Sequence, residues 1–341
     1  MSEKQYRVAV VGATGAVGEA LLDILAERKF PVAELVPLAS ERSAGEVLNY
    51  AGRSVTVQNV NDYDFAGVDI AFFSAGGSVS AEHAPRAAAA GATVIDNTSQ
   101  FRHEPDVPLV ISEVNPHAIA GREARGIIAN PNCSTLQMLV ALAPIHRALG
   151  IERIEVATYQ SVSGAGRSAM EELGRQTARL LNFQDPAPEK FPVQIAFNLI
   201  PHIDAFQANG FTKEEMKMIW ETRKILEDDS IEVNPTCVRV PVFYGHALAC
   251  HVRTRSAVDL DEVRRLLSDS PCVSLADEAA PGGYPTPVTH AAGTDPVYVG
   301  RLRRDPFHDH GLNLWIVADN LRKGAALNAV QIAELLVKNV S

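Results

Sequence analysis

The chain has 341 residues, enough for two domains, and its 46% hydrophobic and 21% charged residues are typical of a globular protein. Its formal net charge of -10 argues against a nucleic-acid partner, which would need a basic surface. Four widely spaced cysteines without a C-x-x-C pair predict neither a disulfide framework nor a zinc site. No apolar run approaches the roughly 20 residues that span a bilayer, and the polar start MSEKQ leads into a strand, so we expect a cytoplasmic protein without a membrane partner.

The first segment, residues 6–28, contains a dinucleotide-binding pattern. It reads as a buried strand, a turn with Gly12, Gly15 and Gly18, and an amphipathic helix. Glycines at this spacing after a first strand permit a tight turn and the close approach of a pyrophosphate. The pattern therefore predicts that a nucleotide binds here.

The next predicted strand, residues 33–39, ends in the stretch LASERSAG. Residues at this position determine whether NAD or NADP binds. Arg42 between Ser40 and Ser43 suits the 2′-phosphate of NADP, whereas Glu41 suits the free ribose of NAD. We favour NADP. An exposed loop with incidental charges is the remaining interpretation.

Further strands and helices alternate up to about residue 131. Short apolar runs predict strands at 68–76, 92–99, 109–114 and 126–131, with a helix over 81–91. Such alternation, with strands that are apolar almost throughout, predicts a doubly wound, Rossmann-like parallel sheet.

The stretch IIANPNCSTLQML, residues 127–139, places Cys133 where a strand ends and a helical period begins. Aligned N–H groups at a helix N-terminus stabilise negative charge, and the thiolate is the nucleophilic form of cysteine. Cys133 is therefore a candidate nucleophile. The alternative is a small buried hydrophobic residue at the junction.

After about residue 130 the strands become longer and need no helix between them, which predicts an α+β domain with a mixed, open sheet. The loop 182–194 lies inside this domain, and a final amphipathic helix over 321–340 is expected to pack on the first domain. The predicted strands are 153–160, 237–243, 246–254, 296–304 and 312–320, and further helices cover 167–181 and 212–227.

Several charged and titratable residues of this domain are candidates for chemistry. His246 begins a strand, and imidazole is the usual acid and base near neutral pH, although a lone histidine is more often structural. His251 falls on the opposite face of that strand, so the two should not share a metal. Arg239 among apolar residues needs a partner, either a substrate carboxylate or an internal acid. Arg102 and Lys217 are surface charges by default.

Five motifs in order, GATGAVG, NPNCST, TYQSVSGAG, RVPVFYGH and DNLRKGAALNAVQIAELL, spread over nearly the whole chain and resemble aspartate-β-semialdehyde dehydrogenases. The resemblance implies a homodimeric enzyme that reduces β-aspartyl phosphate with NADPH, releasing phosphate and aspartate semialdehyde on the route to lysine, threonine, methionine and isoleucine. It implies an NADP-binding domain of residues 1–131 and 320–341, and a catalytic and dimerisation domain of residues 132–319.

The resemblance also implies roles for individual residues. It makes Cys133 the nucleophile and His246 the acid and base, while Gln160 orients the acyl group. It assigns the substrate's α-carboxylate to Arg239 and the α-amino group to Glu214, which lies three residues from Lys217 on one helix face. The phosphate contacts are Lys217, Arg102 and Asn132.

The cofactor contacts come from the glycine turn, the end of the second strand and three later positions, and no metal is expected. They are Gly12, Thr14, Gly15, Ala16, Val17, Ser40, Arg42, Ser43, Ser74, Gly164 and Asn320.

The chain departs from the family pattern at Ser161, where Ala is frequent, at Leu327, where Thr is frequent, and after His246, where a polar residue is common. The letters FYGHA are also similar to a paralogous group that can lack the nucleophile. An alternative function is therefore a catalytically weak, NADPH-binding paralogue with a regulatory role or another acyl phosphate as substrate.

Two related enzyme classes fit the residues less well. A reductase of N-acetylglutamyl phosphate has no need for Glu214, because its substrate carries no free α-amino group. A glyceraldehyde-phosphate-type dehydrogenase would carry Cys-Thr-Thr-Asn, whereas this chain has CSTLQ.

Overall fold

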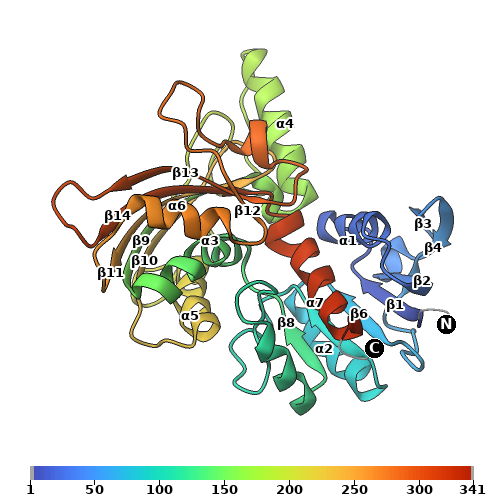
Figure 1. The fold of residues 1–341 in the computed structure, drawn as a ribbon. Helices are drawn as coiled ribbons and strands as arrows, with labels where there is room; N and C mark the ends of the chain where they lie inside the picture. Colours follow the sequence, from blue (N-terminus) through green and yellow to red (C-terminus); the bar gives the residue numbers. More distant parts are fainter. Residues whose placement is uncertain (1–3, 339–341) are drawn as a thin grey trace. The chain divides into compact units, whose positions relative to one another are not determined.

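The computed structural model describes residues 4–338, which form two compact units (Figure 1). Unit 1 contains the described residues of Met1–Asn132 and Ala325–Ser341, and unit 2 is Cys133–Gly324. The first three residues of the predicted polar start, and residues 339 and 340 of the predicted last helix, lie outside the described residues. Within residues 4–338, no helix has both the length and the apolar character needed to cross a membrane.

Unit 1 is built on a parallel sheet of six strands in the order β5-β2-β1-β6-β7-β8. Every neighbouring pair is parallel, and the order reverses direction beside β1, so the doubly wound sheet is confirmed. The strands are β1 (Tyr6–Val11), β2 (Val32–Ala39), β5 (Gln58–Asn59), β6 (Ile70–Phe73), β7 (Thr93–Asp96) and β8 (Ile127–Ala129). A hairpin of β3 (Val47–Tyr50) and β4 (Arg53–Thr56) follows β2.

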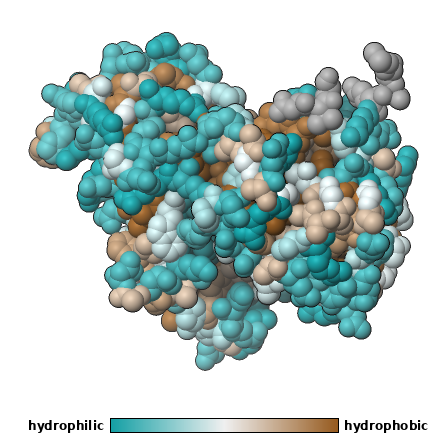
Figure 2. Space-filling view, turned by 90° about the horizontal axis from the view of Figure 1, so that it is seen from below, coloured by the Kyte–Doolittle hydropathy of each residue, from teal (hydrophilic) through white to brown (hydrophobic). Residues whose placement is uncertain are grey.

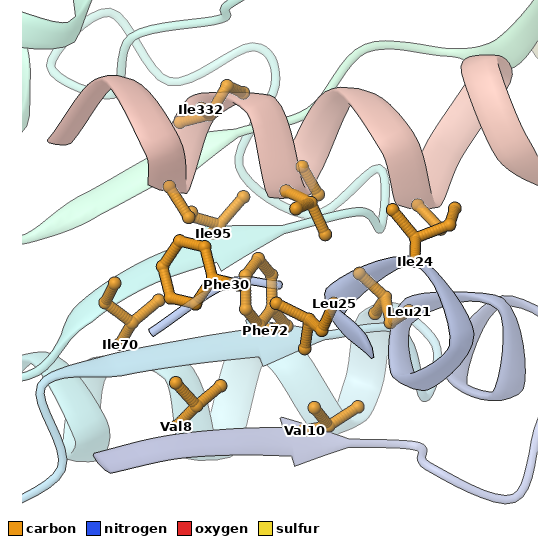
Figure 3. Packing of buried hydrophobic residues seen from close by; sticks show 14 of the residues in the cluster. Val8, Val10, Leu21, Ile24, Leu25, Phe30, Ile70, Phe72, Ile95 and Ile332 are labelled. Atoms are coloured by element: carbon orange, nitrogen blue, oxygen red, sulfur yellow. The ribbon is translucent and has the colours of Figure 1, made fainter. Parts of the chain in front are cut away.

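Alternate residues of these strands pack against two helices from opposite ends of the chain, α1 (Ala16–Glu27) and α7 (Leu327–Lys338) (Figure 3). Phe72 of β6 lies in the same buried cluster as Leu21 of α1 and Ile332 of α7. The helix α2 (Gly77–Ala89) packs on β6, β7 and β8. The prediction that the last helix packs on the first domain is confirmed.

The predicted strand at 109–114 is wrong. Only Leu109 makes a strand-like bridge, with Ala129, and the chain then turns. The Asn115 side chain accepts from the Ile111 N–H at 2.9 Å and donates to the Leu109 carbonyl at 2.9 Å. These side-chain bonds replace the ladder that a strand would need.

Unit 2 contains a mixed sheet of six strands in the order β10-β9-β11-β14-β13-β12, as predicted. Two neighbouring pairs are parallel and three are antiparallel. The strands are β9 (Ile151–Gln160), β10 (Glu232–Arg239), β11 (His246–Thr254), β12 (Val273–Leu275), β13 (Val297–Arg304) and β14 (Gly311–Ala318).

Three helices pack on this sheet. The helix α3 (Cys133–Leu149) contacts β9, β11, β13 and β14, α5 (Lys213–Leu226) lies on β10, and α6 (Leu260–Ser268) lies on β12 and β13. The helix α4 (Arg167–Leu181) is joined to β9 by the short turn Val162–Ala165, and residues 182–194 form the predicted loop. The molecular face in Figure 2 is largely hydrophilic, with hydrophobic residues in smaller groups.

Candidate active site

The glycine turn of unit 1 depends on the absence of side chains. Gly12 has φ of +88°, and a Cβ there would lie 2.8 Å from the Ala75 backbone nitrogen. A Cβ on Gly18 would lie 2.1 Å from the Gly12 carbonyl oxygen. Gly15 precedes α1 without a side-chain cap, so the first turn of α1 keeps backbone N–H groups for an anion.

The other predicted cofactor residues of unit 1 surround this turn. Ser74 donates from its hydroxyl to the Val11 carbonyl at 3.1 Å, at the end of the neighbouring strand. After β2, the exposed Arg42 and Glu41 form no ion pair among the described residues, and Ser43 is buried. Thr14, Ala16 and Val17 lie in the turn and at the start of α1.

The predicted phosphate residues of unit 1 are buried rather than on the surface. Arg102 donates to the Asn97 carbonyl at 2.8 Å and is only 7% exposed. That carbonyl belongs to a turn that Asp96 holds by accepting from the N–H and the hydroxyl of Thr98, at 2.9 Å each. Asn132, the last residue of the first segment of unit 1, is buried as well.

Cys133 is the first residue of α3, as predicted, and is partly exposed. Gln137 follows one turn later on the same helix face and donates to the His246 carbonyl at 3.2 Å. Gly324 lies close on another side, because a Cβ there would be 2.9 Å from the Cys133 Cβ. The start of α3 is thereby tied to the start of β11.

Strand register brings the other predicted residues of unit 2 to one end of its sheet. Arg239 of β10 stands opposite Gln160 of β9. Tyr159 stands opposite Ala247, which places Gln160 beside His246. These three polar residues therefore meet at one sheet end, although they lie far apart in the sequence.

His246 is fully buried, and its two ring nitrogens differ. Nδ1 accepts from the Ser161 backbone N–H at 3.0 Å, whereas the buried Nε2 has no hydrogen-bond partner among the described residues. Burial lowers the pKa of His246 to about 3, and the nearby charge of Arg239 acts in the same direction. The imidazole is therefore neutral near pH 7.

Arg239 is buried, and among the described residues its guanidinium forms no ion pair. Nη1 donates to the Ser161 carbonyl at 2.7 Å. Burial lowers its pKa, and the negative charge of Glu214 acts in the opposite direction. A Cβ on Gly164 would lie 3.1 Å from Arg239 Nη1 and 3.2 Å from His246 Nε2, so this glycine leaves room beside both groups.

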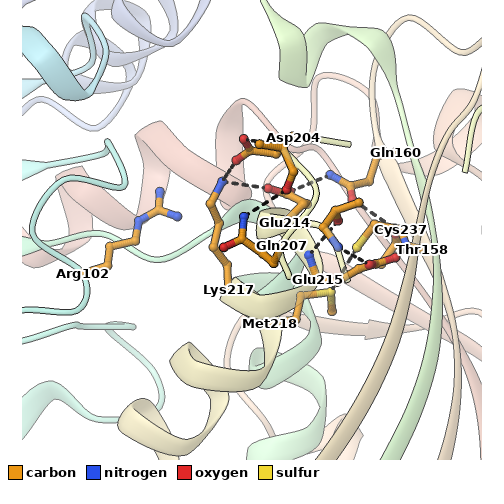
Figure 4. Close-up of polar contacts among 12 residues, drawn as sticks. Arg102, Thr158, Gln160, Asp204, Gln207, Glu214, Glu215, Lys217, Met218 and Cys237 are labelled. Carbon is orange, nitrogen blue, oxygen red and sulfur yellow. Dashed lines mark hydrogen bonds and ion pairs between the residues drawn. The ribbon is translucent and has the colours of Figure 1, made fainter. Parts of the chain in front are cut away.

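A buried polar chain extends from β9 to α5 (Figure 4). Thr158 donates to Gln160 Oε1 and Gln160 Nε2 donates to Glu214, each at 3.0 Å. Lys217 then binds Glu214 at 3.0 Å and Asp204 at 2.8 Å. The one-face arrangement of Glu214 and Lys217 is thus confirmed.

Charge pairing outweighs burial in this chain. Burial alone would lower the pKa of Lys217, but the carboxylates of Glu214 and Asp204 raise it. Lys217 in turn keeps the pKa of Asp204 low, against the effect of burial. At neutral pH Lys217 and Asp204 both carry charge, and the side chain of Lys217 is held between the carboxyl groups of Asp204 and Glu214.

Sequence reasoning missed Ser161, Asp204 and Gly324 as parts of the site. Asn320, predicted as a cofactor contact, is buried and accepts from the Gly245 N–H at 3.0 Å, beside His246. His251 is exposed, on the face opposite His246. Within residues 4–338, no group of three or more His, Cys, Asp or Glu forms a possible metal site.

The two units are those of a class of dehydrogenases in which one unit binds a dinucleotide and the second carries a cysteine at the start of a helix. Residues 7–122 match the family model of the semialdehyde dehydrogenase NAD binding domain, and residues 142–323 match the semialdehyde dehydrogenase dimerisation domain. The chain belongs to the aspartate-semialdehyde dehydrogenase family, whose members are oxidoreductases.

Relatives and solved structures of this family are similar over the full length. An aspartate-semialdehyde dehydrogenase 2 from Vibrio cholerae is 60% identical over 336 residues, which are 98% of this chain and 99% of that protein. A crystal structure of aspartate semialdehyde dehydrogenase II from the same species, complexed with ASA, has a TM-score of 0.97, 59% identity and 99% coverage of both chains. The Candida albicans enzyme with NADP has a TM-score of 0.75 and 25% identity, covering 99% of this chain and 100% of that one.

Proposed function

We propose that the protein catalyses the NADPH-dependent reduction of β-aspartyl phosphate to aspartate semialdehyde and phosphate, through a thioester on Cys133. The observation that carries this proposal is the meeting of Gln160, Arg239 and His246 at one end of the sheet, with Glu214 bonded to Gln160. A cation, a carboxylate and a neutral imidazole gathered in this way suit a small amino-acid substrate.

Substrate recognition pairs each of the two charged groups on the substrate's α-carbon with a residue of opposite charge. Among residues 4–338, the guanidinium of Arg239 has no acid as an ion-pair partner, and it suits the substrate's α-carboxylate, which an arginine can hold bidentately. The carboxylate of Glu214 suits the α-ammonium group. This charge pattern favours a free amino acid over its N-acetylated counterpart.

Acyl transfer comes first. The thiolate of Cys133 attacks the acyl carbon, the bond between that carbon and the phosphate oxygen breaks, and phosphate leaves with the bonding electron pair. We assign neutralisation of the phosphate charge to Arg102 and Lys217, and a hydrogen bond to the phosphate to Asn132. The position of Cys133 at the start of α3 supports the thiolate form.

Reduction follows at the thioester. When bound, NADPH supplies the hydride for this step. The carbon–sulfur bond then breaks, the aldehyde is released and Cys133 regains its thiolate. We assign the proton-handling role to His246, through Nε2, because Nδ1 is already engaged by Ser161.

Unit 1 fits the cofactor, and we propose NADP over NAD. The glycine turn leaves space that a Cβ would fill, and α1 begins with uncapped backbone N–H groups, as a pyrophosphate requires. Arg42 is exposed and forms no ion pair within the part of the chain that the structure describes, which suits a 2′-phosphate. We further propose that Ser74, Gly164 and Asn320 contribute to this site.

The assembly and location of the protein are proposals of the same kind. The match of residues 142–323 to a dimerisation domain supports a homodimer. A biosynthetic enzyme of this class would work in the cytoplasm, where NADPH and the acyl phosphate are made.

The test is the reverse reaction, the phosphate-dependent reduction of NADP by aspartate semialdehyde, with NAD in parallel. We expect wild-type turnover that requires phosphate, prefers NADP and disappears in Cys133→Ala. A matched control is Cys272→Ala, which removes a partly exposed thiol elsewhere in unit 2 and should keep full activity. Wild-type protein that binds NADPH but turns over no semialdehyde would favour the weak paralogue instead.

A further inference from the structure

Ser161 contacts both the predicted acid/base residue and the predicted carboxylate-binding residue. Its backbone N–H donates to His246 Nδ1 at 3.0 Å, and its carbonyl accepts from Arg239 at 2.7 Å. Its one hydroxyl proton can be donated either to the same Nδ1, 3.1 Å away, or to Asn320 Oδ1, 3.0 Å away. Ser161 is itself fully buried, so no water competes for these bonds.

The backbone bond fixes the direction of one proton. A peptide N–H can only donate, so Nδ1 of His246 must be the accepting nitrogen. In a neutral imidazole the other nitrogen then carries the proton. The proton therefore lies on Nε2, which is buried beside Gly164 and has no hydrogen-bond partner within residues 4–338.

The side chains around Ser161 can supply a second donor to Nδ1. Asn320 Nδ2 donates to the Ser163 hydroxyl at 3.0 Å, and Asn320 Oδ1 accepts from the Gly245 N–H at 3.0 Å. The Ser163 hydroxyl lies 3.0 Å from that of Ser161 and donates to the same Asn320 Oδ1 at 3.1 Å. Gly245 and Ser163 can thus occupy both lone pairs of this oxygen, which turns the hydroxyl proton of Ser161 towards His246 Nδ1.

We propose that the Ser161 hydroxyl, oriented by Ser163 and Asn320, is a positioning group that holds His246 as the Nε2–H tautomer. Two donors then meet Nδ1, and a proton on that nitrogen would face both of them. Arg239 from β10, Glu214 from α5 and Cys133 at the start of α3 are the charged or titratable groups nearby. The positive charge of Arg239 also opposes a second proton on the ring.

The tautomer decides what His246 can do, and this consequence rests on the proposed function. An Nε2–H group donates a hydrogen bond to the oxygen that becomes negative when sulfur or hydride adds to the acyl carbon. It has no lone pair with which to remove a proton from the Cys133 thiol.

Nitrogen-15 NMR of the ring nitrogens, in protein labelled at histidine, reads the tautomer directly. His246→Asn identifies the resonances of His246 among the ten histidines. We expect a protonated Nε2 and a strongly hydrogen-bonded, unprotonated Nδ1 near neutral pH. A proton on Nδ1 in the wild-type protein would overturn the proposal without any variant.

Two serine variants separate the hydroxyl from its surroundings. Ser161→Ala removes the hydroxyl but keeps the backbone N–H, whereas Ser163→Ala removes a neighbouring hydroxyl whose hydrogen bonds, among the described residues, go to Ser161 and Asn320. We expect Ser161→Ala to move the Nδ1 resonance towards that of a weakly bonded nitrogen and to lower kcat about fivefold, with the KM for NADP unchanged. Ser163→Ala should cause a smaller change in the same direction.

An unchanged Nδ1 resonance in Ser161→Ala, or equal shifts in both variants, would contradict the role of the hydroxyl. The spectra do not depend on turnover. Inactive wild-type protein with the expected tautomer would therefore refute the proposed function and leave this inference standing. Active protein with the opposite tautomer would do the reverse.

Discussion

The glycine turn of unit 1 and the sheet end of unit 2 prepare for a ligand in opposite ways. At the turn, atoms are missing: Gly12 and Gly18 leave space where any Cβ would collide with backbone. At the sheet end, atoms are crowded: His246 and Arg239 are buried, and both bond to the buried Ser161. The first site should be sensitive to added volume, and the second to lost hydrogen bonds and changed charge.

The largest effect that separates the two regions should appear in the pH dependence of stability. Burial holds the pKa of His246 at about 3, against 6.5 for an ordinary histidine. Between these values the unfolded chain binds a proton that the folded chain does not, so the free energy of unfolding falls as pH falls. The contribution of His246 to this loss should reach several kcal/mol near pH 3.

Denaturant titrations from pH 7 to 4 measure this slope. His246→Asn keeps an acceptor oxygen for the Ser161 N–H but cannot titrate, so its stability should fall less steeply over this range. His251→Asn on the same strand is the control, because that side chain is exposed. Equal slopes for wild type and His246→Asn would show that His246 is charged or solvated in the folded protein.

A change at Arg239 should have the next largest effect. Arg239→Lys keeps the charge but loses the planar group that holds a carboxylate with two parallel bonds, so kcat/KM for aspartate semialdehyde should fall about hundredfold. The KM for phosphate should stay near the wild-type value. Arg102→Lys provides the contrast, since it should raise the KM for phosphate instead. Identical effects of the two variants would contradict their separate roles.

Adding one methyl group to the glycine turn should weaken cofactor binding by a smaller factor. Gly12→Ala places a Cβ 2.8 Å from the Ala75 nitrogen at a φ of +88°, so the dissociation constant of NADPH should rise about thirtyfold. Gly45→Ala is a matched control, because Gly45 has φ of +90° but nothing lies within 4 Å of its added Cβ. Fluorescence titration of NADPH compares them, and equal weakening would point to backbone strain rather than contact.

The smallest effect is expected at Asp204. Its carboxylate holds Lys217 at 2.8 Å and is about one-third exposed, so it would compete only weakly with a phosphate for that ammonium group. Asp204→Asn should therefore lower the KM for phosphate about threefold. An increase would mean that Asp204 positions Lys217 instead of competing for it. Asp228→Asn, at another partly exposed carboxylate of unit 2, should leave this KM unchanged.

Local patterns in the sequence predicted most of the fold. Strand and helix periods predicted both sheets, and the cysteine at the helix start was placed correctly from the spacing after residue 133. The prediction of a strand at 109–114 was wrong because the Asn115 side chain forms hydrogen bonds with backbone groups that a β-ladder would need. An apolar run gives no sign of such a competing bond.

The polar network around His246 could not be read from the sequence. Ser161 and Asn320 are hydrogen-bonded although they lie 159 residues apart in the sequence. A serine that follows a strand belongs to no sequence pattern that predicts such a bond. Asp204 lies in a loop with φ of +69°, a conformation that brings it to Lys217 although no helical spacing connects them. These contacts follow from strand register and loop geometry, which form only when distant segments pair.

The placement of α7 also bears on the order of folding during synthesis. This last helix supplies Leu327, Val330 and Ile332 to the core of unit 1, whereas unit 2 is complete at residue 324. Domains usually fold in the order in which the ribosome releases them. The unit that is begun first therefore cannot be completed until α7 has been synthesised. Its hydrophobic face stays uncovered until then, while unit 2 can already fold.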